Sequence, residues 1–282
     1  MSEAPIRIYI GTDPSQLLGA KIFEYSVRRH TDAVVEFDTM LNVTWPYPKD
    51  PGNQPGTNFS FHRFAIPKRA GYKGRALYVD ADMLVLRDIR ELWNSPFDGA
   101  TVLCAPSSSP GKKRRQLSVL LLDCDRLTWD VDKIITEGLD GGKFTYDQLI
   151  YDLAIEPAGQ MRESLLPEWN SLDKYEPGNT RLVHYTELKR QPWLSRKNKQ
   201  GLFWIQYLSD AIKDGVVTED EIVEATKKGW ARPSLLPLLR SPRAFWPVFE
   251  KTVAPIMDRG FVPHEELQDR LGKARKLAAL SK

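Results

Sequence analysis

Short apolar runs that end in turn residues alternate with segments of helical spacing in the first part of the chain. Residues 6–11, IRIYIG, are typical of a buried strand and lead into Gly-Thr-Asp-Pro. Residues 15–30 carry apolar side chains at helical spacing, with Ser15 as the expected N-cap, and residues 33–40 form a second apolar run. A strand, a helix and a strand of these lengths predict a β–α–β unit and hence a parallel sheet.

The same patterns predict the remaining elements. We expect strands over residues 75–82, 100–106, 117–124 and 180–187, and helices over residues 59–72, 87–94 and 144–155. After Trp193 the pattern changes to helical segments interrupted by prolines. Thr218 and Glu221 have the spacing of a capping box. We therefore predict an α/β domain over residues 1–195 and a helical C-terminal region over residues 196–282.

Composition limits the classes of function. With 282 residues and 41% hydrophobic content, the chain can bury a sizeable core. A net charge of +3 is smaller than a nucleic-acid binder usually shows, so we expect no nucleic-acid partner. Cys104 and Cys124 lack metal-type spacing and suit a reducing compartment.

The expected location is the cytoplasm. The first residues have no basic and apolar segments of a signal peptide, and no run approaches the ~20 apolar residues of a membrane span. Residues 241–257 mix aromatic residues with cations. That mixture fits either core packing or a peripheral membrane contact through the C-terminal region.

Two aspartates stand between apolar runs in the stretch LYVDADMLVL, at Asp80 and Asp82. A carboxylate beside a core is costly unless it is paired or holds a metal. On an extended backbone the two side chains point to the same side with Cα atoms roughly 6–7 Å apart, so both can reach one divalent cation. His184 can add a nitrogen ligand, and this set suits Mn²⁺ or Mg²⁺, with imidazole favouring Mn²⁺. The alternative is that both aspartates only end a strand.

The position of these carboxylates within the predicted sheet also points to a binding site. Asp13 follows the first strand and Asp80 ends the strand of residues 75–82. Ligands of open α/β sheets bind outside the carboxyl ends of the strands. Asp13 and Asp80 are therefore expected to face one crevice.

The order of several motifs resembles that of the family 8 glycosyltransferases. These motifs are LYVDADMLVLRDIRELW, YDQ at residues 146–148, WNSL at residues 169–172 and HYTELKRQPW from His184. The resemblance covers about residues 6–195. It implies the GT-A fold, with a Rossmann-like, mixed and mostly parallel nucleotide-binding sheet. It also implies a retaining, metal-dependent enzyme of hexosyltransferase type that uses a nucleotide-sugar donor, often a UDP-sugar, and an acceptor that the sequence does not identify.

The resemblance also implies roles for single residues. The implied donor-binding residues are Gly11, Thr12, Asp13, Arg63, Asp80, Gln116, Asn170, Lys189 and Arg190. The implied metal ligands are Asp80, Asp82 and His184, and the implied catalytic residues are Asp147 and Gln148. Because Gln148 is a poor nucleophile, front-face attack is favoured, with the leaving phosphate accepting the proton of the acceptor. The alternatives are purely structural: Asp13 is a turn residue, Arg63 a surface charge, Asp147 a helix-start residue and Asn170 a turn cap.

Some positions depart from the family pattern. Ser118 replaces a Gly, Leu149 replaces a second acid, and Gln191 stands where a Lys is usual. The cations of residues 112–115 fit either a solvated loop or contacts to donor phosphates or an anionic acceptor. Two other functions therefore remain: a non-catalytic nucleotide or sugar-nucleotide binding protein of the same fold, and a nucleotidyltransferase, although the phosphate-loop match in GTDPSQLLGAK is weak.

Overall fold

The structure, a computed structural model, describes residues 4–106 and 115–264, except for the side chain of Gln116. Its centre is a six-stranded mixed sheet with the strand order β2-β1-β3-β6-β5-β7. The strands are β1 (Ile6–Gly11), β2 (Val35–Asp38), β3 (Arg75–Asp80), β5 (Val102–Ala105), β6 (Gln116–Asp123) and β7 (Met161–Arg162). β1 pairs in parallel with β2 and β3, and β5 with β7, whereas β6 is antiparallel to β3 and β5. The predicted β–α–β unit and α/β class are confirmed.

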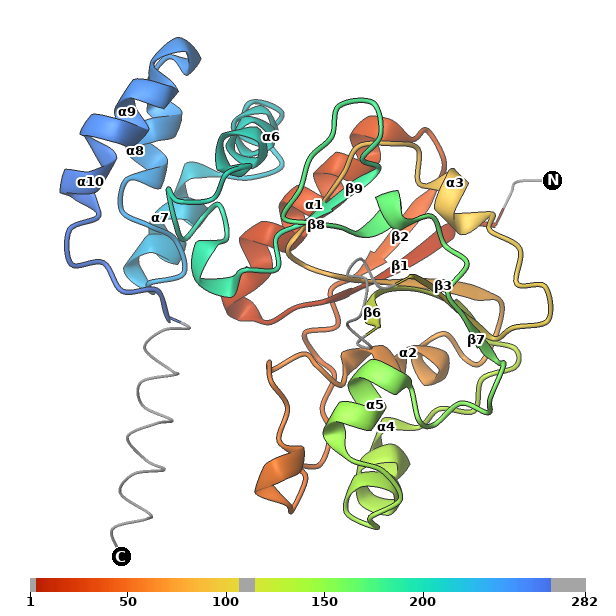
Figure 1. Cartoon of the computed structure of the whole chain (residues 1–282). Coiled ribbons are helices and arrows are strands. Elements are labelled where there is room, and N and C mark those ends of the chain that lie inside the picture. The colour runs from red at the N-terminus through yellow and green to blue at the C-terminus, as the bar shows by residue number, and fades with distance from the viewer. Residues whose placement is uncertain (1–3, 107–114, 265–282) are drawn as a thin grey trace, which may run out of the picture.

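Helices cover both faces of this sheet (Figure 1). On one face, Ile8 of β1 packs with Phe23 of α1 (Leu17–His30). On the other, Tyr78 of β3 packs in the same cluster as residues of α2 (His62–Arg69) and α5 (Tyr146–Asp152). Because successive strand residues point to opposite faces, the nearly continuous apolar strands serve two separate cores.

A second, three-stranded sheet lies beside the first. It has the order β4-β9-β8 and consists of β4 (Met83–Val85), β8 (Ser171–Leu172) and β9 (Leu182–His184). The chain leaves the main sheet at Asp80, bends at Ala81 and Asp82, and enters the second sheet at Met83. The predicted continuous strand over residues 75–82 is therefore wrong at its end, because Met83 pairs with His184 and not with the main sheet.

The C-terminal region is helical, as predicted. Its helices are α6 (Gly201–Lys213), α7 (Glu219–Lys227), α8 (Leu235–Arg240), α9 (Trp246–Thr252) and α10 (Ala254–Met257). The capping box of α7 forms, since Thr218 Oγ1 accepts from the Glu221 amide at 3.3 Å and Glu221 accepts from the Thr218 amide at 3.0 Å. Trp204 of α6 shares a core with Ile22 of α1. The domain boundary near residue 195 remains a prediction.

The shorter elements complete the path of the chain. They are α3 (Arg90–Trp93), α4 (Val131–Lys133), a π-helix η3 (Ile134–Leu139), and the 3₁₀ helices η1 (Pro14–Gln16), η2 (Pro51–Asn53), η4 (Pro167–Asn170), η5 (Leu188–Arg190) and η6 (Arg243–Phe245). Ser15 is not the N-cap that we expected, because Asp13 Oδ1 caps η1 and accepts from the Ser15 amide at 2.9 Å. Within the described ranges, no helix has the length and apolar character that crossing a membrane requires.

Candidate metal and donor site

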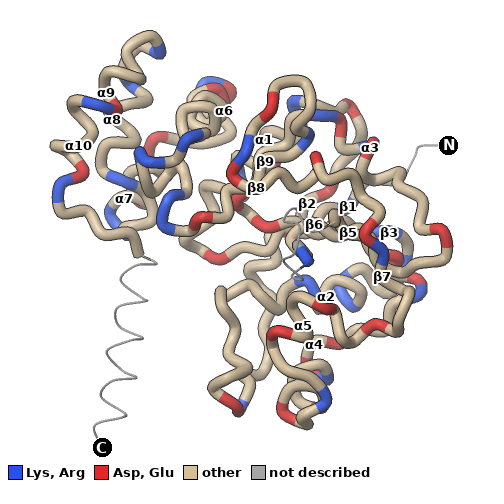
Figure 2. The backbone as a smooth tube through the Cα atoms, viewed as in Figure 1, with Lys and Arg blue, Asp and Glu red and all other residues tan. Residues whose placement is uncertain are grey.

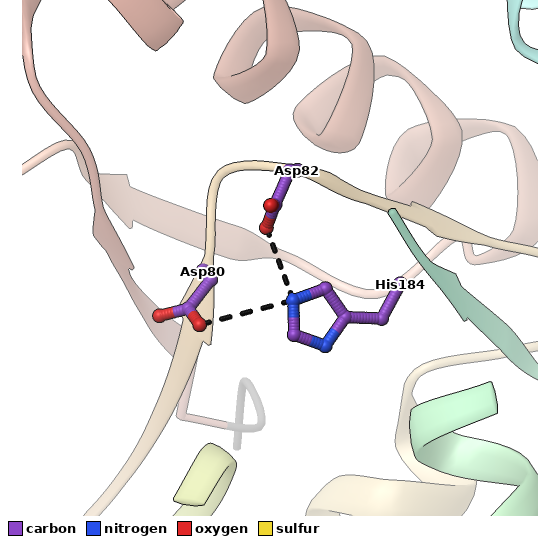
Figure 3. Close-up of side chains that lie close together, drawn as sticks. All are labelled: Asp80, Asp82 and His184. Atoms are coloured by element: carbon purple, nitrogen blue, oxygen red, sulfur yellow. Dashed lines mark ion pairs between the residues drawn. The ribbon is translucent and has the colours of Figure 1, made fainter. Parts of the chain in front are cut away.

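Asp80, Asp82 and His184 converge from three positions of the fold (Figure 3). Asp80 ends β3, Asp82 lies in the bend before β4, and His184 ends β9. His184 Nε2 lies 3.2 Å from Asp82 Oδ1 and 3.9 Å from Asp80 Oδ2. One ligand atom from each residue lies within 4.8 Å of the others, and no other such cluster of His, Cys, Asp or Glu occurs in residues 4–106 and 115–264.

The second oxygen of each carboxylate is held by a neighbour. The Gln191 side chain, which is fully buried, donates from Nε2 to Asp82 Oδ2 at 2.8 Å. The Tyr78 hydroxyl donates to Asp80 Oδ1 at 2.5 Å, and Arg63 Nη2 lies 3.6 Å from that oxygen. Asp82 Oδ1 and Asp80 Oδ2 are therefore the oxygens that face the histidine.

His184 is fixed in a similar way. Its Nδ1 lies 2.9 Å from Asn170 Oδ1 and 3.3 Å from Ser118 Oγ, and all three side chains are buried. With Nδ1 engaged there, Nε2 is the ring atom that faces the carboxylates.

These residues fit a divalent cation. Asp82 Oδ1 is buried and has no hydrogen-bond partner among the described residues, which is costly unless an ion, or a proton on His184 Nε2 at 3.2 Å, completes it. Two carboxylate oxygens and one imidazole nitrogen form a usual donor set for such ions. Metal ligands are typically held by hydrogen bonds from behind, as Asp80, Asp82 and His184 are here.

The electrostatics of the cluster couple metal binding to protons. Burial raises the pKa of Asp80, although Arg63 and His184 lower it. Burial would lower the pKa of His184, but the carboxylates of Asp82 and Asp80 raise it above its ordinary value. A proton on His184 Nε2 would compete with a cation for the same position, so a cation would bind more strongly there as pH rises.

The cluster lies at the base of an open cleft of about 250 Å³. Because β6 runs antiparallel to β3, Leu117 and Ser118 near its start lie beside Asp80 and line the cleft. Arg63 also lines it and is only 7% exposed, with its guanidinium 4.6 Å from the Tyr78 ring centroid. Arg63 is therefore not a surface charge.

A second groove, of about 290 Å³, lies between α1 and α7. Its lining includes Leu17, Leu18, Ala225 and Trp230 and is mostly apolar. None of the clustered carboxylates or His184 lines this groove, so we assign the candidate site to the smaller cleft.

The first-strand loop ends next to the cluster. Gly11 is paired with Asp80 across the sheet, and a Cβ at Gly11 would overlap the Tyr78 side chain. Thr12 is buried, and Asp13 accepts from Asn58 Nδ2 at 3.1 Å while it also caps η1. The structure thus brings Gly11 to Asp80, but Gly11, Thr12 and Asp13 are not among the cleft-lining residues, and contact of this loop with a nucleotide remains a prediction.

The predicted catalytic residues lie at the start of α5. Asp147 and Gln148 are exposed, and neither is among the cleft-lining residues, whereas Ile150 and Tyr151 are. Gln148 Oε1 accepts from the Thr145 amide at 2.8 Å as part of a capping box. Gln148 therefore has a role in the helix start that accounts for its position.

Among the predicted phosphate-contacting residues that the structure describes, Arg115 lines the cleft and Lys189 and Arg190 do not. Lys189 and Arg190 are exposed on η5, and Arg190 pairs with Glu187 at 3.1 Å. Arg115 lines the cleft and contacts Glu163 at 2.6 Å. The Gln116 side chain and residues 112–114 lie outside the described part of the chain.

Tyr78, Gln191 and Ser118 hold the cluster in place and were not predicted from the sequence to do so. Tyr78 precedes Asp80 by two residues, so the period of a strand could have placed both on the same face. Gln191 and Ser118 were noticed only as departures from a family pattern. Gln191 contacts Asp82 and Ser118 contacts His184. These residues are far apart in the chain, so no local sequence pattern predicts the contacts.

Comparison with solved structures identifies the fold as that of GT-A glycosyltransferases. The galactosyltransferase LgtC, in complex with donor and acceptor sugar analogs, aligns with a TM-score of 0.53 and 13% identity, over 76% of this chain and 98% of that one. The apo glycosyltransferase GlyE of Streptococcus pneumoniae TIGR4 aligns with a TM-score of 0.50 and 14% identity, over 81% and 65%. The bifunctional WbbM aligns with a TM-score of 0.52 and 14% identity, over 80% and 52%.

Sequence comparison adds a local match. Protein CDI of Arabidopsis thaliana is 33% identical over 104 residues, which are 36% of this chain and 40% of that protein. The matched region therefore covers less than half of that curated relative. No family model matches the chain.

Proposed function

We propose that the protein is a metal-dependent glycosyltransferase that moves a sugar from a nucleotide-sugar to an acceptor. The observation that carries this proposal is the convergence of Asp80, Asp82 and His184 in an open cleft at the carboxyl end of β3, on a GT-A fold. The similar fold of LgtC, whose structure holds donor and acceptor sugar analogs, supports a cleft that receives both. A UDP-sugar donor, a hexose, Mn²⁺ and retention rest on the motif resemblance.

The residues of the cleft suggest how the reaction proceeds. A divalent cation, when bound, supplies Lewis-acid stabilisation to a diphosphate leaving group. Arg63 and Arg115 line the cleft and place positive charge near the same group. The donor-binding roles of Gly11, Thr12, Asp13 and the other residues implied by the resemblance belong to this proposal.

Retention fits the distribution of carboxylates. Asp80 and Asp82 are the acidic residues that line the cleft within the described part of the chain, and both belong to the metal cluster. No third carboxylate there is placed to form a glycosyl-enzyme bond, which favours front-face attack. The bond from the anomeric carbon to the phosphate oxygen breaks, the acceptor oxygen bonds on the same face, and its proton passes to the leaving phosphate.

Nucleotide binding tests the proposal directly. We expect UDP to raise the melting temperature in the presence of Mn²⁺ and not of EDTA, with about 2.7 kcal/mol of stabilisation at one hundred times Kd. Asp82→Asn should abolish this shift and turnover of UDP-sugars while the fold stays intact. Glu36→Gln, on the exposed side of β2, is the matched control and should behave as wild type. Metal-independent binding, or full activity of the Asp82 variant, would exclude the assigned site.

A non-catalytic nucleotide-binding protein is the second candidate. It is favoured by Gln148, which caps α5, and by the fully buried Leu149 in place of an acid. This candidate predicts Mn²⁺-dependent UDP binding without hydrolysis or transfer of any UDP-sugar. Slow hydrolysis that disappears in Asp82→Asn would exclude it.

A peripheral membrane contact through the C-terminal region is also part of the proposal. Phe245, Val248 and Ile256 are 61%, 56% and 68% exposed along η6, α9 and α10, and Lys251 and Arg259 are exposed beside them. Figure 2 shows that Lys and Arg are spread over the whole molecule, so the apolar residues and not the charge distinguish this surface. Exposed apolar side chains with cations in the same segment fit the headgroup region of anionic lipids.

Vesicle sedimentation tests this contact. Vesicles with phosphatidylglycerol should sediment the wild-type protein and not the double variant Val248→Ser, Ile256→Ser. Equal sedimentation of both proteins would exclude the surface. The proposed cytoplasmic location rests on Cys104 and Cys124, which are free and buried and whose pKa values burial raises to about 12.

A further inference from the structure

We infer that Asn170 is a positioning residue that fixes the ring of His184 for metal binding, and that Ser118 in turn fixes Asn170. This inference rests on the proposed metal site and gives Asn170 a role other than contact with the donor sugar. Asn170 and Ser118 are 4% and 6% exposed, and His184 is 5% exposed. The three therefore form a buried polar contact behind the metal-facing side of the imidazole.

The orientation of the Asn170 amide follows from its two contacts. Asn170 Nδ2 donates to Ser118 Oγ at 3.2 Å, which turns Oδ1 toward His184 Nδ1 at 2.9 Å. An amide oxygen can only accept, so Nδ1 carries a proton in this arrangement. Nε2 then faces Asp82 Oδ1 and Asp80 Oδ2, and its lone pair is available to a cation when the imidazole is neutral.

The fold keeps these three residues together. Asn170 ends η4, Ser118 lies near the start of β6, and His184 ends β9. Ser118 also lies 3.3 Å from His184 Nδ1, so its hydroxyl contacts both partners. Outer contacts of this type set ligand orientation, and their loss typically weakens metal affinity 10–100-fold.

Two substitutions separate the acceptor role from packing. Asn170→Leu keeps the approximate volume and removes the acceptor, so we expect Mn²⁺ affinity to fall about 10–100-fold by calorimetry on the full chain. Asn170→Asp keeps an acceptor oxygen and should stay within a few-fold of wild type. The Mn²⁺ affinity of Ser118→Ala should lie between those of the two Asn170 variants, because the Asn170 amide loses the partner that orients it. Asn42→Leu, at an exposed position, is the matched control.

A second measurement does not depend on metal. The Nδ1 proton of His184 should give a protected, downfield proton NMR signal that disappears in Asn170→Leu. Equal Mn²⁺ affinity of wild type and Asn170→Leu, or equal loss in the Leu and Asp variants, would overturn the inference, as would an unchanged Nδ1 signal in Asn170→Leu. If the wild-type protein bound no Mn²⁺, the proposed function would fail, and the Nδ1 signal would still decide whether Asn170 accepts this proton.

Discussion

At Asp82, the two oxygens of one carboxylate have different surroundings. Oδ2 accepts from the buried Gln191 amide, and Oδ1 has no hydrogen-bond partner among the described residues and faces His184. A buried acceptor that is left unsatisfied costs about 1–3 kcal/mol, so the arrangement is reasonable only if an ion or a proton completes it.

His62 gives a prediction that is independent of the metal site. Burial lowers its pKa to about 4, and its ring packs on Trp45 with centroids 5.0 Å apart. The unfolded chain therefore takes up a proton near pH 6.5 that the folded chain resists until about pH 4. This part of the stability is present above pH 6.5 and is lost as pH falls, by about 3 kcal/mol at pH 4.

Urea unfolding of wild type and His62→Phe between pH 8 and pH 4 measures this contribution. Between pH 8 and pH 4 the phenylalanine variant should lose about 3 kcal/mol less stability than wild type, because it has no imidazole to protonate. If both proteins lost equal stability over this range, His62 would have to be protonated readily in the folded state.

The sequence predicted the residues of the metal cluster but not their support. Asp80 and Asp82 were found because a carboxylate within apolar sequence is unusual, and His184 because it could complete their ligand set. Gln191 joins Asp82 across 109 residues, and Asn170 reaches His184 from the end of η4, next to the pairing of β8 with β9. Such contacts depend on tertiary packing, which neither period nor propensity describes.

At the scale of elements, the bend between β3 and β4 positions the two aspartates. This bend is packed closely against α1, because a Cβ at Gly19 would lie 2.9 Å from the Ala81 carbonyl oxygen and 3.0 Å from the Trp193 ring. A glycine in the first turns of a helix otherwise costs about 1 kcal/mol relative to alanine. The close approach of α1 to the bend explains why a small residue is needed there.

Gly19→Ala should therefore destabilise the protein in spite of better helix propensity. We expect a net loss of about 1–2 kcal/mol from overpacking, and a weaker Mn²⁺ affinity because the bend that carries Asp82 must move. Gly201→Ala in α6, where a Cβ would meet its neighbour at an ordinary 3.5 Å, is the matched control and should not weaken Mn²⁺ binding. Urea unfolding and calorimetry with Mn²⁺ measure both effects. Wild-type behaviour of Gly19→Ala would show that the bend tolerates a larger residue.

Most element types could be predicted, and most errors lie where an element depends on a distant partner. β1, α1, β3 and β6 follow from local periodicity. The division of residues 75–85 into β3 and β4 does not, because β4 is defined by pairing with β9, about a hundred residues further on. The short β7 and β8 have too few residues to carry a pattern.

At the scale of the whole molecule, one core joins the sheet region to the C-terminal helices. Ile22 and Tyr25 of α1, Val183 of β9, and Trp204 and Leu208 of α6 all belong to it. In Figure 1, α6 lies between α1 and the outer helices. The helical region thus covers apolar surface that the sheet region would otherwise expose.

This shared core makes a prediction about the boundary near residue 195. A chain of residues 1–195 would leave Leu18, Ile22 and Trp193 without their partners, at about 1.5–3 kcal/mol for each large side chain. Because domains have only about 5–15 kcal/mol of net stability, we expect this fragment to lose cooperative unfolding and to bind a hydrophobic dye. A chain that ends at His264 keeps the residues of all three cores, and its urea midpoint is the reference for the fragment. Cooperative unfolding of the 1–195 fragment at that same midpoint would instead show two independent domains, and the cleft, whose described lining residues lie between Thr57 and Leu188, could then be studied on that fragment alone.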